Sequence, residues 1–147
     1  MRAVIQRSRK SSVEVDGKLV NKIAFGLVIL VGITDTDTIA DINYLVKKIV
    51  NLRIFDDENG VMNKSIKDVN GEILSISQFT LYAECKNGNR PSYSKASKRE
   101  IALPLYERFN EELNKEVKTY PGVFGADMFL NIQNDGPVTI IIDSEEK

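Results

Sequence analysis

The reactions that this chain could catalyse are limited first by the residue types that it lacks. The 147 residues include no histidine and a single cysteine, Cys85. Histidine is the commonest general base, and Ser-His-Asp triads, Cys-His pairs and imidazole zinc sites all require it. One cysteine also excludes thiolate metal clusters and an internal disulfide. We therefore expect neither a metal nor a cofactor, so any catalysis must use hydroxyls, carboxylates, lysines, backbone amides or the substrate itself.

One pair of hydroxyls, on Ser77 and Thr80, lies at the end of a predicted strand, in the string Ser77-Gln78-Phe79-Thr80-Leu81. Thr80 could act as a nucleophile. A threonine hydroxyl is weakly nucleophilic unless a base takes its proton, and the string contains no lysine or carboxylate. Alternatively, both hydroxyls only satisfy backbone groups at the strand end, which is the better explanation for either residue taken alone.

The charges of the chain are nearly balanced, with a formal net charge of -1. No overall basic field therefore recruits a nucleic acid, and any contact with RNA must come from local clusters. Two runs that lack acidic residues, 1–10 and 86–99, are candidates. Their cations are Arg2, Arg7, Arg9 and Lys10 in the first run and Lys86, Arg90, Lys95, Lys98 and Arg99 in the second. Each run is compatible with a solvated surface as well as with a phosphate-binding face.

Composition predicts one folded domain over residues 1–147. Hydrophobic residues make up 42% and charged residues 28%, which is typical of a globular protein, and the length suffices for one core. The longest apolar run, Ile23 to Ile33, is about half the length of a membrane-spanning helix. The start of the chain lacks the apolar stretch of a secretory signal. We therefore expect a cytoplasmic protein without a membrane partner.

The elements that must position these residues begin with strands. An opening strand is predicted at 1–7, and residues 11–15 and 19–23 alternate around Asp16-Gly17, a two-residue hairpin signal. A central buried strand follows at 27–33. Thr38 and Asp41 then form the capping pair of a helix. Its apolar residues recur at helical spacing: Ile39, Ile42, Leu45, Val46, Ile49 and Leu52.

The second half predicts strands at 72–78, 117–120, 128–132 and 138–143, turns at Asn59-Gly60 and Asn70-Gly71, and a loop at 86–97. A second helix is expected through Ile101, Leu105, Phe109 and Leu113, with Pro104 delaying its start or bending it. Strand-rich halves with two helices on one face predict an α+β domain with mainly antiparallel sheets.

Two strings, residues 77–81 and Asn134-Asp135-Gly136-Pro137-Val138-Thr139, resemble the signature of the D-aminoacyl-tRNA deacylases. The resemblance extends in register over nearly the whole chain. It includes Ile5-Gln6-Arg7, Arg53-Ile54-Phe55, Arg90-Pro91-Ser92, Leu105-Tyr106 and Phe124-Gly125-Ala126-Asp127-Met128. The chain departs from the family at Pro104, since the usual proline lies near Lys98, and at Tyr93, where phenylalanine is common. Neither departure touches the two signatures.

The resemblance implies the fold of that family and a carboxylic ester hydrolase that removes D-amino acids from tRNA. Catalysis would be assisted by the free vicinal hydroxyl of the terminal ribose, while the protein positions the ester and stabilises the oxyanion. The catalytic segment is then Ser77, Gln78, Phe79 and Thr80. We expect the amides around Phe79 and Thr80 to line the oxyanion position, and Ser77 and Gln78 to fix the strand end that presents them.

The resemblance also implies that the Gly136-Pro137 peptide bond is cis and that its carbonyls enter the active site of a partner subunit in a homodimer. This backbone would exclude L-amino acids by a clash, so that many D-residues and glycine are accepted. Arg7 is the candidate that holds the carbonyls of Gly136 and Pro137, with a solvated arginine as the alternative. Phe124 and Met128 are expected to wall the adenosine or aminoacyl pocket, or simply to pack in the core.

The acceptor end of the tRNA would meet Lys86, Arg90 and Lys95 through its phosphates. Two other functions remain open. One is a hydrolase that uses Thr80 as its nucleophile, and the other is a non-enzymatic nucleic-acid-binding protein. The overall acidity of the chain and the lack of a basic stripe with interleaved aromatics argue against the second.

Overall fold

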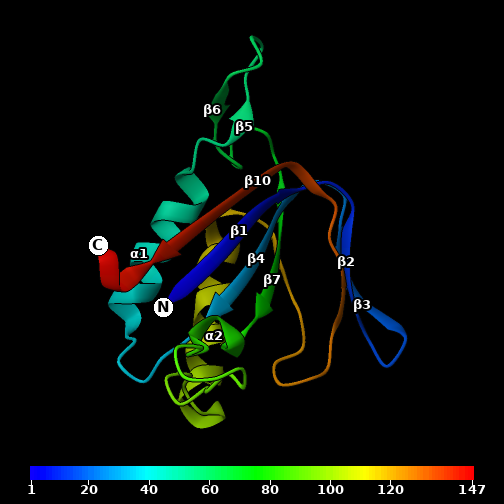
Figure 1. Ribbon diagram of the computed structural model, residues 1–147. Coiled ribbons are helices and arrows are strands. Elements are labelled where there is room, and N and C mark those ends of the chain that lie inside the picture. Colours follow the sequence, from blue (N-terminus) through cyan, green and yellow to red (C-terminus); the bar gives the residue numbers. More distant parts are fainter.

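The computed structural model describes residues 1–147 and is organised around a five-stranded mixed sheet. The strand order is β10-β1-β4-β7-β8, and its first four strands lie side by side in Figure 1. The bounds are Arg2–Ser8 for β1, Gly26–Gly32 for β4, Glu72–Ser77 for β7, Thr119–Pro121 for β8 and Asn134–Asp143 for β10. β1 is antiparallel to both β10 and β4, whereas β7 is parallel to β4 and to β8. β10 is therefore an edge strand, and its outer side has no partner within the chain.

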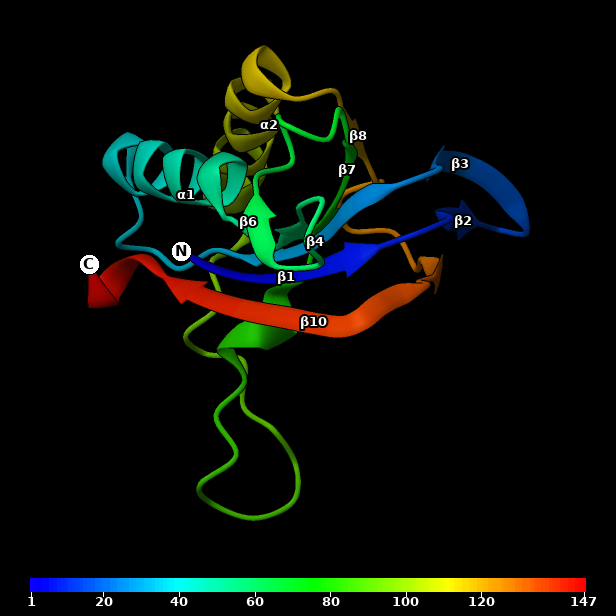
Figure 2. The same ribbon diagram turned by 90° about the horizontal axis from the view of Figure 1, so that it is seen from above.

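Two helices cover one face of this sheet (Figure 2). α1 spans Ile39–Asn51 and begins with the predicted capping box of Thr38 and Asp41, and α2 spans Arg99–Glu116. The main core lies between these helices and the sheet, since alternate side chains of the strands point toward them. It includes Ala3 and Ile5 of β1, Leu27, Ile29 and Val31 of β4, Ile42, Leu45 and Ile49 of α1, and Phe109 and Leu113 of α2.

The opposite face of the sheet is only partly covered. A small sheet of order β3-β2-β9 packs against one end of it, formed by β2 (Ser11–Val15), β3 (Lys18–Ile23) and β9 (Phe129–Asn131). A second core joins the two sheets through Val13, Ile23, Val28, Leu74 and Ile76. The predicted hairpin of β2 and β3 is confirmed, because Asp16 and Gly17 both have the positive φ of a primed turn. The rest of this face stays open to solvent.

The second helix differs from the prediction in two respects. Pro104 neither delays it nor ends it: α2 starts at Arg99 and includes the proline, which removes only the N–H group that would donate to the Glu100 carbonyl. Ile101 and Leu105 were expected on the buried face, but Ile101 is 45% exposed and Leu105 is only partly buried. Ala102 and Tyr106 are buried in their place, whereas Phe109 and Leu113 are buried as expected. The inward stripe of this helix is thus shifted by one residue at its start.

Three short elements were not predicted. A small hairpin joins β5 (Phe55–Asp56) to β6 (Met62–Lys64) across the expected turn at Asn59-Gly60. Two 3-10 helices, η1 (Phe79–Tyr82) and η2 (Ser144–Glu146), follow β7 and β10. No helix of the fold is both long and apolar enough to cross a lipid bilayer.

Candidate active site

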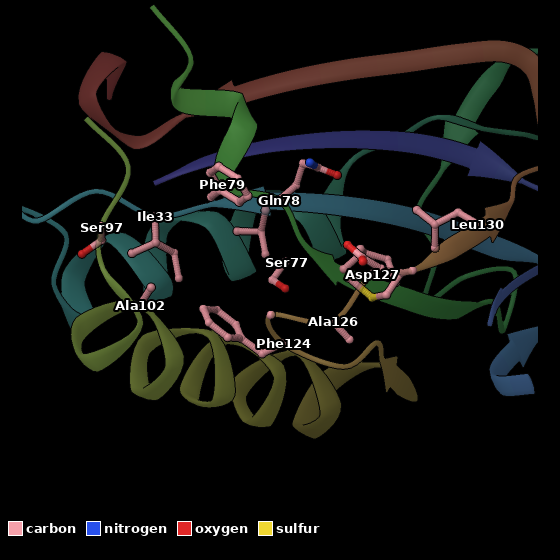
Figure 3. Close-up of a pocket in the computed structure, with 14 residues that line it drawn as sticks. Ile33, Ser77, Gln78, Phe79, Ser97, Ala102, Phe124, Ala126, Asp127 and Leu130 are labelled. Carbon is pink, nitrogen blue, oxygen red and sulfur yellow. The ribbon is translucent and has the colours of Figure 1, made fainter. Parts of the chain in front are cut away.

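A hollow of about 320 Å³ opens beside the end of β7. Its walls come from the ends of β4 and β7, from the beginning of α2 and from the segment 124–130, so residues far apart in sequence meet there (Figure 3). The polar and aromatic lining residues are Ser77, Gln78, Phe79, Ser97, Phe124 and Asp127, and the apolar ones include Ile33, Ile76, Ala102, Ala126, Met128 and Leu130.

The predicted catalytic segment turns sharply at this hollow. The Gln78 N–H group donates to the Val31 carbonyl at 2.8 Å, after which the chain leaves the sheet and enters η1. Gly32 allows this close approach, since a Cβ there would lie 3.1 Å from the Gln78 carbonyl oxygen and from the Leu81 Cβ. The N–H groups of Phe79 and Thr80 are the first two of η1, so they have no intrahelical acceptor, and no side chain caps them. Two backbone donors are therefore available next to the hollow.

The two hydroxyls of this segment have different surroundings. Ser77 lines the hollow and its hydroxyl points into it (Figure 3). Thr80 does not line the hollow, and its Oγ1 accepts a hydrogen bond of 2.6 Å from Gln78 Nε2. No hydrogen bond joins either hydroxyl to a lysine or a carboxylate. The geometry thus supplies neither hydroxyl with a base.

Phe124 and Met128 stand in the wall of the hollow. The Phe124 ring packs on Tyr106 with a centroid distance of 5.7 Å. Tyr106 is buried and its hydroxyl donates to the Ser75 carbonyl at 2.8 Å, which ties α2 to β7 behind the hollow. Burial raises the pKa of Tyr106, so this phenol stays a hydrogen-bond donor at neutral pH. The aromatic wall is therefore held in place by the sheet itself.

Asp127 was not assigned a role from the sequence, although it lies within a string that resembles the family. Asp127 carries the only charged side chain among the residues that line the hollow. Ser97 and Ala102 were also missed, because they come from the loop and helix that reach the hollow only in the folded chain. The position of Asp127 between two assigned wall residues, Phe124 and Met128, was the one available signal for it.

Gly136 and Pro137 lie elsewhere, at the start of the edge strand β10, and do not line the hollow of their own chain. Their peptide bond is cis, as the resemblance implies, and both residues are exposed. Gly136 has a φ of +121°. Asn134 braces the turn from within, since its Nδ2 donates to the carbonyls of Arg7 and Val138 at 3.0 and 2.9 Å.

Arg7 supports this turn, but not through the predicted contacts. Its Nε donates to the Asp135 carbonyl at 3.3 Å rather than to those of Gly136 and Pro137, and its Nη1 donates to the Ile54 carbonyl at 2.8 Å. The guanidinium also lies 3.4 Å from the carboxylates of Asp56 and Asp135. Arg7 is buried rather than solvated. The reason is the bulge between Gln6 and Ser8 in the β1–β10 register, which leaves residues 135–138 unpaired with β1 and brings the Asp135 carbonyl within reach of Arg7.

The three cations expected to meet phosphates, Lys86, Arg90 and Lys95, lie on the long exposed loop that follows η1 and projects away from the helices (Figure 2). Lys95 pairs with Glu84 at 3.3 Å. A hydrogen bond from the Lys86 N–H group and the contact with Lys95 lower the pKa of Glu84. None of the three cations lines the hollow.

Comparison with known proteins agrees with this geometry. The family model described as D-Tyr-tRNA(Tyr) deacylase matches residues 4–143. Proteins named D-aminoacyl-tRNA deacylase from Flavobacterium psychrophilum and Parabacteroides distasonis are each 60% identical to this chain, covering 100% of it and 99% of their own length. One from Clostridium acetobutylicum is 55% identical over 99% of both chains.

Solved structures agree as well. The c-Myc DNA unwinding element binding protein superposes with a TM-score of 0.91 at 42% identity, covering 97% of this chain and 98% of that one. A probable eukaryotic D-amino acid tRNA deacylase has the same fold, with a TM-score of 0.81 at 17% identity over 96% and 97% of the two chains. With the family match over nearly all residues and relatives at 60% identity, the chain belongs to the D-Tyr-tRNA(Tyr) deacylase family.

Proposed function

We propose that this chain hydrolyses the ester between a D-amino acid and the terminal ribose of tRNA, which releases the free D-amino acid and an uncharged tRNA. The observation that carries the proposal is the hollow beside β7, where the family's Ser77–Thr80 string meets Phe124 and Met128. The relatives that share 60% of this sequence over its whole length bear the name of that activity. An enzyme that hydrolyses D-aminoacyl-tRNA would act in the cytoplasm, where aminoacyl-tRNA is used.

The reaction adds water across the ester, so it needs a positioned water and a site for the developing oxyanion. The N–H groups of Phe79 and Thr80 suit the second role, since both are uncapped and fixed by η1. The vicinal hydroxyl of the ribose would orient or activate the water, because no side chain in this segment can act as a strong base. Ser77 and Gln78 would fix the strand end. This division of work requires no metal, cofactor or histidine.

Chiral selection would come from the Gly136-Pro137 turn of a second protomer. The turn is exposed and rigidly supported by Arg7 and Asn134, yet it lies away from the hollow of its own chain. Backbone atoms held against the α-carbon would clash with an L side chain and leave a D side chain free. Glycine has no side chain to clash, so glycyl-tRNA should also be cleaved.

The open face of the sheet suits self-association. Val4 pairs with Ile141 on one side and with Leu30 on the other, so these three apolar side chains form a row across β10, β1 and β4. Ile141 is 67% exposed, and the same protomer also exposes Phe79 and Phe129, at 56% and 69%. Exposed apolar surface of this kind marks an interaction site. A homodimer with two-fold symmetry would cover it on both protomers.

Hydrolysis of matched D- and L-tyrosyl-tRNA by the purified chain tests the proposal. We expect rapid release of D-tyrosine, little release of L-tyrosine, and release of glycine from glycyl-tRNA. Equal rates on D- and L-tyrosyl-tRNA would refute chiral selection. A substrate that ends in 2′-deoxyadenosine separates the mechanisms, since unchanged activity on it would rule out assistance by the ribose hydroxyl. Tight binding of uncharged tRNA without any turnover would instead favour the non-enzymatic alternative.

A further inference from the structure

A second hollow, of about 690 Å³, runs along α2 and adjoins the first at Phe124. Phe124 is the one residue that lines both hollows. We call the second hollow the α2 groove. One side of it is built by residues that recur every three to four positions along α2, including Arg99, Leu103, Glu107, Asn110, Glu111 and Asn114. The other side is the segment from Thr119 to Phe124.

Arg99 stands where the two hollows meet. Its guanidinium carbon lies 5.5 Å from the centre of the Phe124 ring, and its Nη1 lies 3.4 Å from the Phe124 carbonyl oxygen. Gly125 leaves room for it, because a Cβ there would be 2.8 Å from Arg99 Nη1. No carboxylate lies within ion-pair distance of Arg99, and its side chain is exposed. A guanidinium with spare donors at this place is suited to an anion such as a phosphate.

The rest of the α2 groove has a different chemistry. Glu107 makes no ion pair, and Glu111 only approaches Arg108 at 3.7 Å. The Asn114 Oδ1 accepts the Thr119 N–H group at 3.0 Å, which leaves the amide NH₂ of Asn114 free to donate. The two carboxylates disfavour a run of phosphates along the groove, so a phosphate contact is confined to the end where Arg99 lies. Carboxylate acceptors and an amide donor instead match the edge of cytosine, whose N4 amino group donates and whose ring carbonyl accepts.

We propose, given the deacylase function proposed above, that the α2 groove binds the cytidine that precedes the terminal adenosine of tRNA. Arg99 contacts the phosphate that links the two nucleotides, and Glu107 accepts from the cytosine amino group. The shared wall residue Phe124 carries this assignment: for a terminal nucleoside that occupies the first hollow with its 5′-phosphate toward Phe124, Arg99 is the unpaired cation beside that phosphate.

Calorimetric binding of three probes tests the phosphate contact: adenosine, cytidylyl-3′,5′-adenosine and uridylyl-3′,5′-adenosine. We expect the wild-type chain to bind cytidylyl-adenosine about tenfold more tightly than adenosine. In Arg99→Ala this advantage should disappear while adenosine binding is unchanged. Arg108→Ala is the matched control, since Arg108 lies on the same helix, pairs with Glu112 at 2.7 Å and lines neither hollow. It should behave like the wild type.

The uridylyl probe tests the base contact, because uracil has an oxygen where cytosine has the amino group. The wild type should prefer cytidylyl-adenosine over uridylyl-adenosine, and Glu107→Gln should lose this preference. The inference is overturned if cytidylyl-adenosine binds no better than adenosine, or if Arg99→Ala weakens both probes equally, which would reduce Arg99 to a support for Phe124. These readouts do not depend on turnover, so absence of D-tyrosyl-tRNA hydrolysis would count against the proposed function and not against this site.

Discussion

Arg7 Nη2 lies 3.3 Å from the point where a Cβ on Gly136 would be, while Nε of the same guanidinium donates to the Asp135 carbonyl one residue earlier. The arginine therefore fills the space beneath the turn of β10. It also joins this turn to the base of the β5–β6 hairpin through the Ile54 carbonyl. One buried side chain thus fixes the Gly136-Pro137 turn, which we propose enters the active site of the partner protomer.

Gly136→Ala should damage the turn directly. Gly136 has a φ of +121°, and an added Cβ would lie 2.7 Å from both the Cγ2 and the backbone nitrogen of Val138. We expect a loss of about 1–3 kcal/mol in the free energy of unfolding, measured by urea denaturation, together with loss of D-tyrosyl-tRNA hydrolysis. Gly60→Ala is the control. Its φ is +73° but nothing lies within 4 Å of an added Cβ, so it should cost about 1 kcal/mol and keep activity. Equal behaviour of the two variants would contradict this account.

Arg7→Ala should be one of the more destabilising substitutions in the chain. It removes the donor of two backbone carbonyls and leaves the neighbouring carboxylates of Asp56 and Asp135 without this buried partner. Those carboxylates are 53% and 27% exposed, so water can replace the guanidinium there, and the expected loss of about 1–3 kcal/mol in the free energy of unfolding comes from the Asp135 and Ile54 carbonyls left without their charged donor. Arg9→Ala is the comparison, since its side chain is 72% exposed and approaches Asp135 at 3.8 Å, so a change below about 1 kcal/mol is expected. Chemical denaturation of both variants gives the difference, and similar values would show that Arg7 is not structurally important.

Thr80→Ala distinguishes the two hydrolase mechanisms. The Thr80 hydroxyl accepts from Gln78 and has no base beside it, so its removal should reduce kcat/KM for D-tyrosyl-tRNA by less than about tenfold. A nucleophilic threonine would instead lose about 10⁴-fold or more. Thermal unfolding of the variant should accompany the rates. A folded but inactive protein would favour Thr80 as the nucleophile and count against the RNA-assisted mechanism.

The fold was largely predictable because its signals are local. The capping pair of Thr38 and Asp41, the Asp16-Gly17 turn and the apolar run before Gly32 each specify their element within a few residues. The β5–β6 hairpin was missed because its strands of two and three residues are too short to show an alternating pattern. Burial of Ala102 in place of Ile101 depends on how α2 sits on the sheet, which no local pattern encodes.

The site was predictable only in part. The family strings located Ser77 to Phe79, Phe124 and Met128, and the structure brings these together in one hollow. The contacts of Arg7 could not be predicted, since the choice between the Asp135 carbonyl and its neighbours depends on the bulge in the β1–β10 register between Gln6 and Ser8. Arg99 was seen only as part of a basic run, because its stacking on Phe124 joins residues 25 positions apart.

Asp41→Asn should lower stability in a pH-dependent way. Burial alone would raise the pKa of Asp41, but hydrogen bonds from Lys147 Nζ at 2.8 Å and from the Thr38 N–H group at 2.9 Å outweigh it, so the pKa lies well below its usual range. A lowered pKa in the folded state means that the carboxylate stabilises the fold above the unfolded value of about 3.9 and loses this contribution as pH falls.

We therefore expect the free energy of unfolding of the wild type to exceed that of Asp41→Asn by about 1 kcal/mol at pH 5–8. This difference should shrink below about pH 4. Urea denaturation across this pH range measures it. Asp16→Asn in the β2–β3 turn is the control, because Asp16 makes no hydrogen bond with its side chain and Asn tolerates its φ of 51°. A difference that grew in acid would show that the Asp41 contacts do not favour the ionised carboxylate.

A shared active site can be tested by mixing two inactive variants. Gly136→Ala damages the turn that we propose enters the partner's hollow. Ala126→Trp should block the hollow of the protomer that carries it, since Ala126 lines this hollow. If the turn acts in the partner's hollow, a heterodimer has one site in which both parts are intact. Random exchange of equal amounts makes half of the dimers mixed, and each has one good site of two, so activity should return to about a quarter of the wild-type level.

Two outcomes of the mixing experiment would refute the shared site. If each protomer used its own turn and its own hollow, every site in the mixture would contain one damaged part, and the mixture would stay inactive after exchange. If the chain were monomeric, light scattering would report about 16.5 kDa and mixing would again restore nothing. Ile141→Lys tests whether the open face of the sheet forms the dimer interface. It should shift the dimer toward the monomer and lower activity in proportion, because Ile141 is 67% exposed in the isolated chain and has no packing role to lose there.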